Sequence, residues 1–314
     1  MDPPQIDTLT VSQEQWTKAF MEGPHTSFGM VKVLMKELRL DFPKLLEKPE
    51  ELSEAFKDRK PLIYNIEDRP WVNTWAGETG RCTSFAVKVA RALERAHPSV
   101  FKFMYFDLGR HRVARCARTN ILINSDSDTG AKIMLPSAHD TDWTERDRRG
   151  RYKFRVEGYS IYEGKEPLEP GVERRSRRDP VSPEEAMSVC LQEVAQNMVF
   201  ICCFRSLEDG KPKYLSLIRW NIEKKRIELT PNVNRRDQIY CITFDRERGN
   251  QASEKECVEN LVEFIREYGT PHQWLVEDVY YTNQALWEAA VHKWGKPVWS
   301  AEGLVSQLLG TLPT

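Results

Sequence analysis

Hydrophobic and polar positions change their spacing along this chain, and the spacing predicts where helices and strands occur. Within residues 1–60, apolar side chains recur three and four positions apart, as on one face of a helix, at Val31, Leu34, Met35 and Leu38. Ser12 has a side chain that favours helix N-caps, which predicts that a helix begins there. Pro43 is expected to interrupt a helix. A further helical pattern covers residues 82–96 and ends before Pro98.

Strand patterns dominate the centre of the chain. Short apolar runs predict strands at residues 62–66, 100–106, 112–118, 121–124 and 132–135. Residues 140–180 are polar and rich in turn residues, which predicts a long loop region with short strands at 152–156 and 159–162. Two arginine clusters in this region have the chemistry to bind phosphate, but interspersed acidic residues favour a solvated loop instead.

Both patterns occur in the last part of the chain. A turn at Glu208-Asp209-Gly210 predicts a hairpin between two strands, at 199–205 and 214–220. Further strands are predicted at 225–229 and 238–244. Helices are predicted at residues 183–197, 254–268, 283–294 and 301–309.

This order of elements predicts an α+β protein. We expect a helical N-terminal subdomain over residues 1–60 and a core of one helix and an antiparallel sheet over 61–165. A β-rich subdomain is expected over 166–250, and a helical C-terminal subdomain over 251–314.

Composition and charge exclude several classes of protein. The 314 residues include 46 basic and 47 acidic ones, so the net charge of −1 gives no reason to expect a nucleic-acid partner. No apolar run approaches the roughly 18 residues that a membrane span needs, and no signal peptide is predicted. The seven cysteines are odd in number and contain no CxxC pair, which favours a reducing, cytoplasmic location without disulfides or zinc.

Cys82 is the strongest candidate for a chemical role. It is predicted to lie in the first turn of a helix, directly after a glycine-containing loop. The unpaired N–H groups and the dipole of a helix N-terminus stabilise an anion there, which lowers the pKa of a thiol and makes it a better nucleophile. The alternative is that Cys82 is an ordinary buried cysteine.

His111 is the candidate base among six histidines, because it alone opens a predicted strand shortly after the cysteine helix. A nucleophile–base pair needs a third group that orients the imidazole. Asn124 is favoured for this role by its position at the end of an apolar strand, and Asp126 by its charge. A surface position for His111, between Arg110 and Arg112, is the alternative.

The loop before the nucleophile supplies candidates for substrate binding. Gly80 leaves room for a substrate beside the sulfur atom, and Arg81 separates it from the cysteine. Trp71 and Trp75 have the size to line an acyl pocket, although tryptophans of this kind more often anchor packing.

Residues 80–128 resemble the transglutaminase-like superfamily, and in layout the arylamine N-acetyltransferase-like cysteine acyltransferases. The similarity consists of Gly80-x-Cys82-x-x-x-Ala86 at a helix start, then His111 opening a strand, then a polar residue after the next strand. The resemblance implies a papain-type core with Cys82 as nucleophile, His111 as base, and Asn124 or Asp126 as the third member. It also implies a thioester on the cysteine that an amine, a carbon nucleophile or water resolves.

The sequence therefore predicts an acyltransferase that forms an amide, or a cyclised product, on a small-molecule substrate. No tightly bound cofactor is expected; the acyl donor would be a thioester of coenzyme A or of a carrier protein. Two alternatives remain open: a cysteine amidase or peptidase with water as acceptor, and a non-catalytic binding module on the same fold.

Overall fold

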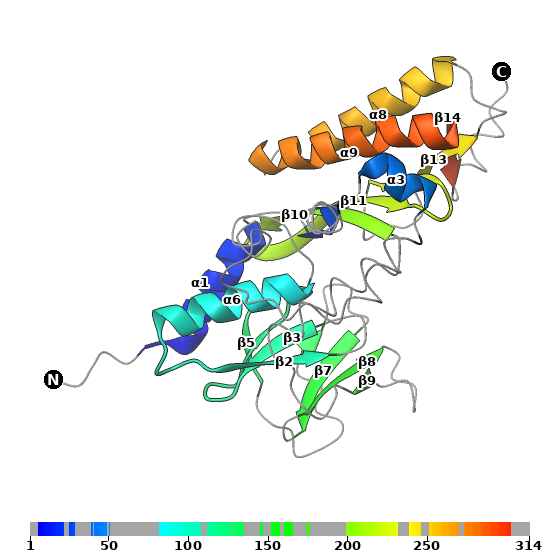
Figure 1. Cartoon of the computed structure of the whole chain (residues 1–314). Helices are drawn as coiled ribbons and strands as arrows, with labels where there is room; N and C mark the ends of the chain where they lie inside the picture. The colour runs from blue at the N-terminus through cyan, green and yellow to red at the C-terminus, as the bar shows by residue number, and fades with distance from the viewer. Residues whose placement is uncertain are drawn as a thin grey trace.

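The computed structural model describes most of the predicted elements of the chain (Figure 1). The described residues are 6–21, 25–28, 39, 41–48, 50, 82–107, 112–127, 129–134, 145–146, 152–157, 160–165, 174–175, 199–231, 239–245, 251–269 and 273–302. Helices and antiparallel sheets occur in separate parts of the chain, so the fold is α+β, as predicted.

The largest sheet has six antiparallel strands in the order β1-β10-β11-β12-β13-β14. Its strands are β1 (His25–Thr26), β10 (Val199–Glu208), β11 (Lys211–Asn221), β12 (Arg226–Thr230), β13 (Ile239–Asp245) and β14 (Lys296–Glu302). The predicted hairpin between β10 and β11 is confirmed, with Glu208 paired to Lys211. Its two turn residues, Asp209 and Gly210, have φ angles of 52° and 74°. Positive φ at both positions matches the twist of the two strands, which explains why an Asp-Gly pair occupies them.

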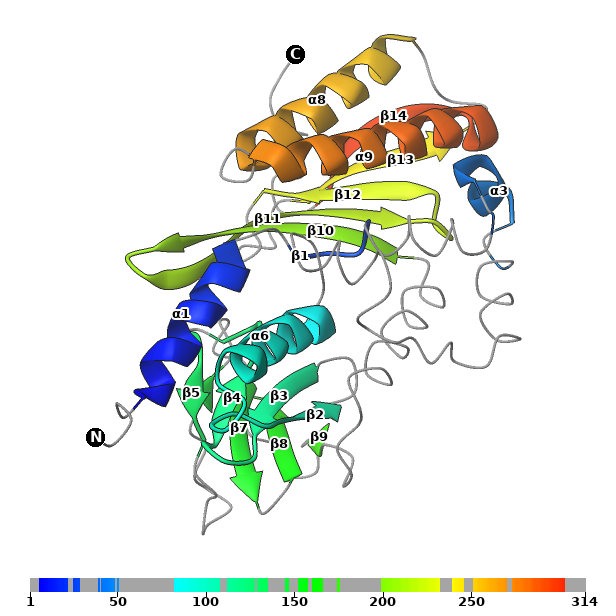
Figure 2. The ribbon, with the colours of Figure 1, turned by 60° about the vertical axis from the view of Figure 1, so that its left-hand side comes forward.

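A second sheet carries the strands that follow the predicted nucleophile helix. Its order is β2 (Phe103–Asp107), β3 (Arg112–Cys116), β4 (Ile121–Ile123) and β5 (Lys132–Ile133), all antiparallel. Helix α6 (Cys82–Ala96) lies between this sheet and the six-stranded one, beside α1 (Thr8–Met21) (Figures 1 and 2). The bounds of α6 are those that its hydrophobic spacing predicts.

The polar stretch predicted as a loop contains a third antiparallel sheet. Its strands are β6 (Glu145–Arg146), β7 (Tyr152–Glu157), β8 (Ser160–Lys165) and β9 (Arg174–Arg175). The two short strands predicted here are confirmed as β7 and β8, which form a hairpin. The loop prediction was wrong for the arginine pair of β9, because Arg174 and Arg175 pair with Glu163 and Tyr162 of β8.

Helices α8 (Gln251–Gly269) and α9 (Gln273–Trp294) lie along the β12–β14 side of the six-stranded sheet (Figure 2). Phe244 of β13 packs edge-on against Trp287 and Trp294 of α9, with ring centroids 5.5 and 5.4 Å apart. Helix α3 (Phe42–Glu47) adds to this end of the molecule, where Trp294 donates a hydrogen bond to the carbonyl of Leu46. Burial of these aromatic side chains supplies most of the favourable energy of the contact.

The core forms one large cluster that joins α1, α6, the six-stranded sheet and the two C-terminal helices. In the second sheet, Ala114, Cys116, Ile121 and Ile123 belong to this large cluster. Val113, Leu122, Phe106 and Met134 instead form a small cluster of their own. The second sheet is therefore apolar on both faces, since alternate residues of a strand point to opposite faces.

Three predictions about the ends of the helices were wrong. Helix α1 begins at Thr8 and is capped by Asp7, whose carboxylate accepts hydrogen bonds from the backbone N–H groups of Leu9 and Thr10. Ser12 lies inside the helix, where its hydroxyl donates to the carbonyl of Thr8. Pro43 lies in the first turn of α3, where a missing N–H is tolerated, and so begins a helix that it was expected to interrupt.

The third error concerns the helix predicted at 301–309: its first two residues belong to β14, and residues 303–309 lie outside the described residues. The other two helices predicted for this part are confirmed as α8 and α9, although α9 begins at Gln273, ten residues before its predicted start.

Strand β14 pairs with β13 along its length, from Lys296 opposite Asp245 to Glu302 opposite Ile239. Strand β1 likewise joins β10 from the N-terminal part. The six-stranded sheet thus takes strands from three of the four predicted subdomains. The strand predicted at 62–66 and the helices predicted at 31–38 and 183–197 lie outside the described residues.

Candidate active site

Cys82 is the first residue of α6 and is buried, with 7% of its surface exposed. The next two residues, Thr83 and Ser84, are also buried, at 1% and 3%. A helix N-terminus leaves backbone N–H groups without intrahelical partners, and its dipole is positive at this end. A thiolate at Cys82 would therefore lie in a partly positive environment that water reaches poorly.

The first turn of α6 contacts the start of β3. Arg112, the first residue of β3, donates a hydrogen bond from Nη1 to Oγ1 of Thr83 over 3.4 Å. Its guanidinium is buried, since 2% of the residue is exposed. The residue directly before Arg112 in the sequence is His111. Thr83 follows the candidate nucleophile in the sequence, and Arg112 follows the candidate base, so the contact joins the neighbours of these two residues.

The end of β4 contacts the same turn of the helix through Trp16. This tryptophan of α1 donates from Nε1 to the backbone carbonyl of Asn124 over 2.8 Å. Its ring packs edge-on against Phe85 of α6, with centroids 5.4 Å apart. Trp16 and Asn124 are both fully buried.

The strand register agrees with these contacts. Ala114 of β3 pairs with Ile123 of β4 in an antiparallel ladder. The first residue of β3 and the residue after β4 therefore lie at the same end of these two paired strands. The start of α6, the start of β3 and Asn124 thus come together from three elements.

Asn124 and Asp126 share a tight turn after β4. The backbone N–H of Asp126 donates to Oδ1 of Asn124 over 2.9 Å. An amide oxygen has two lone pairs, so an asparagine can accept from a backbone N–H and from an imidazole N–H at the same atom. Asn124 is fully buried and Asp126 is half-buried. Asn124 therefore shares the interior with Cys82, whereas Asp126 is nearer to water.

The remaining predicted site residues lie outside the described residues: His111, Trp71, Trp75, Gly80 and Arg81. Their assignment as base and substrate-binding residues stays a prediction.

Cys202 of β10 provides a contrast with Cys82. It is fully buried in the six-stranded sheet, and this burial raises the pKa of its thiol well above the ordinary value. The neighbouring Cys203 raises the pKa further. The Cys202 thiol is therefore inert at neutral pH, because the thiolate is the reactive form.

Two buried arginines near the start of α6 were missed in the sequence. Arg112 was noted as a neighbour that weakened the case for His111, and Arg205 of β10 was treated as the end of an apolar strand. The guanidinium carbon of Arg205 lies 4.4 Å from the ring centroid of Phe20 and 5.3 Å from that of Phe85. Nothing in the local sequence signals these contacts, because they join segments far apart in the chain.

The described residues contain no group of three or more histidine, cysteine and acidic side chains arranged to hold a metal ion. None of the helices described combines the length and the apolar character that crossing a bilayer requires. Comparisons with protein-family models, with curated proteins and with solved structures gave no match to this chain.

Proposed function

We propose that this chain is a cysteine-dependent acyltransferase in which Cys82 carries the acyl group as a thioester. The observation that supports the proposal is the meeting of three elements at one end of α6. Arg112 contacts Thr83, and Trp16 bridges Phe85 to Asn124. A relay of nucleophile, base and orienting group needs side chains from separate elements brought together in this way.

The proposed reaction has two steps. His111 takes the thiol proton of Cys82, and the thiolate attacks the carbonyl carbon of a thioester donor. A carbon–sulfur bond to Cys82 forms, the bond to the donor's sulfur breaks, and the leaving thiolate takes the proton back from His111. An amine then attacks the Cys82 thioester and gives its proton to His111. The amide forms, and the thiolate of Cys82 is released.

The third member of the relay is Asn124 in this proposal, with Asp126 as the alternative. An asparagine oxygen can accept a hydrogen bond from an imidazole N–H, which would fix the ring, and Asn124 is fully buried at the end of β4. Asp126 offers a charge that would also stabilise the imidazolium, but it is half-buried. The variant N124A should therefore lower the rate of acyl transfer more than D126A.

An amine is the favoured acceptor because the nucleophile is shielded from water. Cys82 is 7% exposed, and a thioester on it would be protected from hydrolysis. Transfer to an amine is therefore favoured over the amidase or peptidase alternative. We propose a small molecule as acceptor and a thioester of coenzyme A or of a carrier protein as donor.

A non-catalytic binding module is the second candidate. Its support is that the bonds described for Asn124 hold together a turn, and that a buried cysteine needs no chemical role. The two candidates differ in one measurable property, which is the reactivity of Cys82.

The decisive experiment is alkylation with limiting iodoacetamide across a range of pH, with mass spectrometry of each labelled cysteine. Cys202 serves as an internal reference that should stay unlabelled in the folded protein. We expect Cys82 to be labelled fastest, with a midpoint well below the free-thiol pKa of about 8.5. The variant H111A should remove this preference.

Either outcome has a clear meaning. A low midpoint that H111A abolishes supports the pair and justifies a search for acyl donors by the mass of a Cys82 adduct. That adduct should then disappear faster with added amine than in buffer alone. Labelling of Cys82 no faster than that of the other cysteines would refute the acyltransferase and favour the binding module.

A further inference from the structure

We propose that Arg112 is a positioning residue for the nucleophile: its buried guanidinium fixes the first turn of α6 against β3 and stabilises the thiolate of Cys82. This inference rests on the proposed function, since it assigns a new role within the same site. It concerns a residue to which the sequence pattern gave no chemical role.

The burial of Arg112 is the first argument. A guanidinium keeps its charge inside a protein, and removing it from water is costly. Arg112 is nevertheless 2% exposed, although a strand start is a place where a long side chain can easily reach solvent. Active sites use buried charges of this kind, in contact with the helix that carries a candidate nucleophile, to shift the reactivity of a thiol.

The position of the charge is the second argument. Arg112 Nη1 contacts Oγ1 of Thr83, and the Cα atoms of Thr83 and Cys82 are about 3.8 Å apart. The guanidinium therefore contacts the residue that directly follows the thiol in the first turn of α6. Because the surroundings are buried, salt and water screen the interaction poorly. The helix dipole and Arg112 thus act in the same direction on a thiolate.

Other charged residues among those described also lie near this end of α6. Arg205 contacts the ring of Phe85 from β10 and would also favour the thiolate, although one helical turn further along. Asp126 follows β4 and would oppose it, but it is half-buried. Asp107 of β2 is paired directly opposite Arg112 in the register, and a carboxylate at that position would reduce the effect of the guanidinium. Of these groups, Arg112 contacts the residue next to Cys82, so we expect its charge to have the largest effect.

The test measures the pH midpoint of Cys82 alkylation in the full chain for R112M, R112K and T83V. In R112M we expect the midpoint to rise by about one pH unit and the rate at pH values below both midpoints to fall about tenfold. R112K keeps a positive charge and should recover part of the shift. T83V removes the hydrogen bond but not the charge, so its midpoint should rise by less than that of R112M.

The controls separate a charge effect from damage to the fold. Cys202 must remain unlabelled in each variant, since its protection depends on the intact six-stranded sheet. If R112M exposes Cys202, R112Q replaces it, because glutamine keeps a hydrogen-bond donor without the charge. An unchanged midpoint in a folded R112M or R112Q, with a low wild-type midpoint, overturns this inference alone. A wild-type midpoint near 8.5 overturns the proposed function as well.

Discussion

Trp16 shows how a single residue can connect the candidate site to the rest of the core. It stacks on Phe20 of its own helix, packs edge-on against Phe85, and donates a hydrogen bond to Asn124. An indole supplies both a large apolar surface and one donor, and a buried indole N–H needs an acceptor. Trp16 therefore fixes the distance between the start of α6 and the end of β4.

The variant W16F tests this role. It keeps an aromatic ring but leaves the carbonyl of Asn124 without that donor, which should lower the free energy of unfolding by about 1–3 kcal/mol. If Asn124 orients the base, alkylation of Cys82 should also slow. Chemical denaturation gives the first quantity, and the labelling assay gives the second.

A matched control exists at the other end of the molecule. Trp294 is also buried and donates from Nε1 to a backbone carbonyl, that of Leu46, over 3.2 Å. W294F should cost a similar free energy of unfolding without changing the labelling rate of Cys82. Equal slowing in both variants would mean that global stability, and not the position of Asn124, sets the reactivity.

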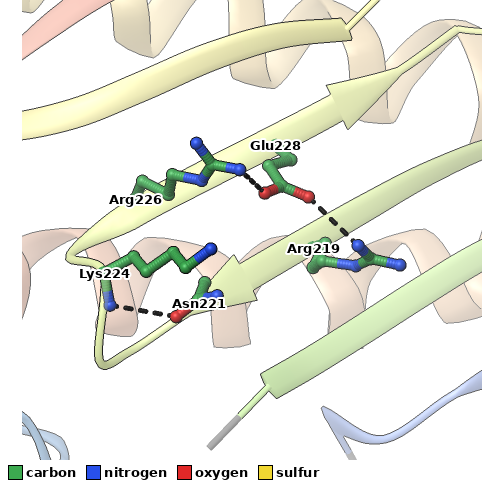
Figure 3. A network of polar contacts seen from close by, with 5 residues as sticks. All are labelled: Arg219, Asn221, Lys224, Arg226 and Glu228. Carbon is green, nitrogen blue, oxygen red and sulfur yellow. Dashed lines mark hydrogen bonds and ion pairs between the residues drawn. The ribbon is translucent and has the colours of Figure 1, made fainter. Parts of the chain in front are cut away.

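At the scale of elements, the β11–β12 hairpin contains a polar network on one face (Figure 3). Glu228 of β12 lies between Arg226 of its own strand and Arg219 of β11, and accepts a hydrogen bond from each. Arg219 and Glu228 are directly opposite each other in the register. The side chain of Glu228 is 11% exposed, so the two guanidiniums replace most of the contact that its carboxylate would make with water.

Removing this carboxylate should destabilise the sheet. E228Q removes the charge and replaces one acceptor oxygen with an NH2 donor, so one of the two guanidiniums loses its acceptor. We expect a loss of about 1–3 kcal/mol in the free energy of unfolding. The comparison is E208Q at the β10–β11 turn, where Lys213 and Glu208 pair with side chains 43% and 63% exposed. That variant should change the free energy of unfolding by less than about 1 kcal/mol. Equal effects in the two variants would show that burial is irrelevant to the network.

The elements also differ in how well their sequences predict them. The predicted bounds of α6 were correct because a long amphipathic pattern, ended by proline, is a local signal. The β10–β11 hairpin was predicted correctly because a tight two-residue turn requires positive φ at both positions, and Asp-Gly is one of the few pairs that tolerate it. Strand β14 was missed, since its residues acquire their conformation by pairing with β13.

At the scale of the whole molecule, the N-terminal and C-terminal parts contact each other through α3 and α9. Lys293 donates to a carboxylate oxygen of Glu47 over 2.6 Å. The hydrogen bond and the charge of Lys293 hold the pKa of Glu47 below its ordinary value of 4.5. A group whose folded pKa is lowered stabilises the protein above its unfolded pKa, and loses this effect as the pH falls through the folded pKa.

The variant E47Q should therefore melt at a lower temperature than the wild type at pH 7, and the difference should vanish in acid, below the lowered pKa of Glu47. Thermal melts across this range provide the measurement. E259Q is the control, since Lys255 and Glu259 form an exposed pair within α8 that joins no separate elements. A difference for E47Q that is the same at all pH values would contradict a role for this ion pair.

The sequence by itself determined the class of the fold and its longest elements, because hydrophobic spacing and turn residues act over a few positions. It also indicated Cys82 and Asn124 as candidates, from their places at the ends of a helix and a strand. The tertiary structure alone decided which of these ends meet. The bond from Trp16 to Asn124 spans 108 positions of the chain, and the bond from Arg112 to Thr83 spans 29. Contacts of that range depend on how the layers pack, and packing leaves no periodic pattern in the residues that it brings together.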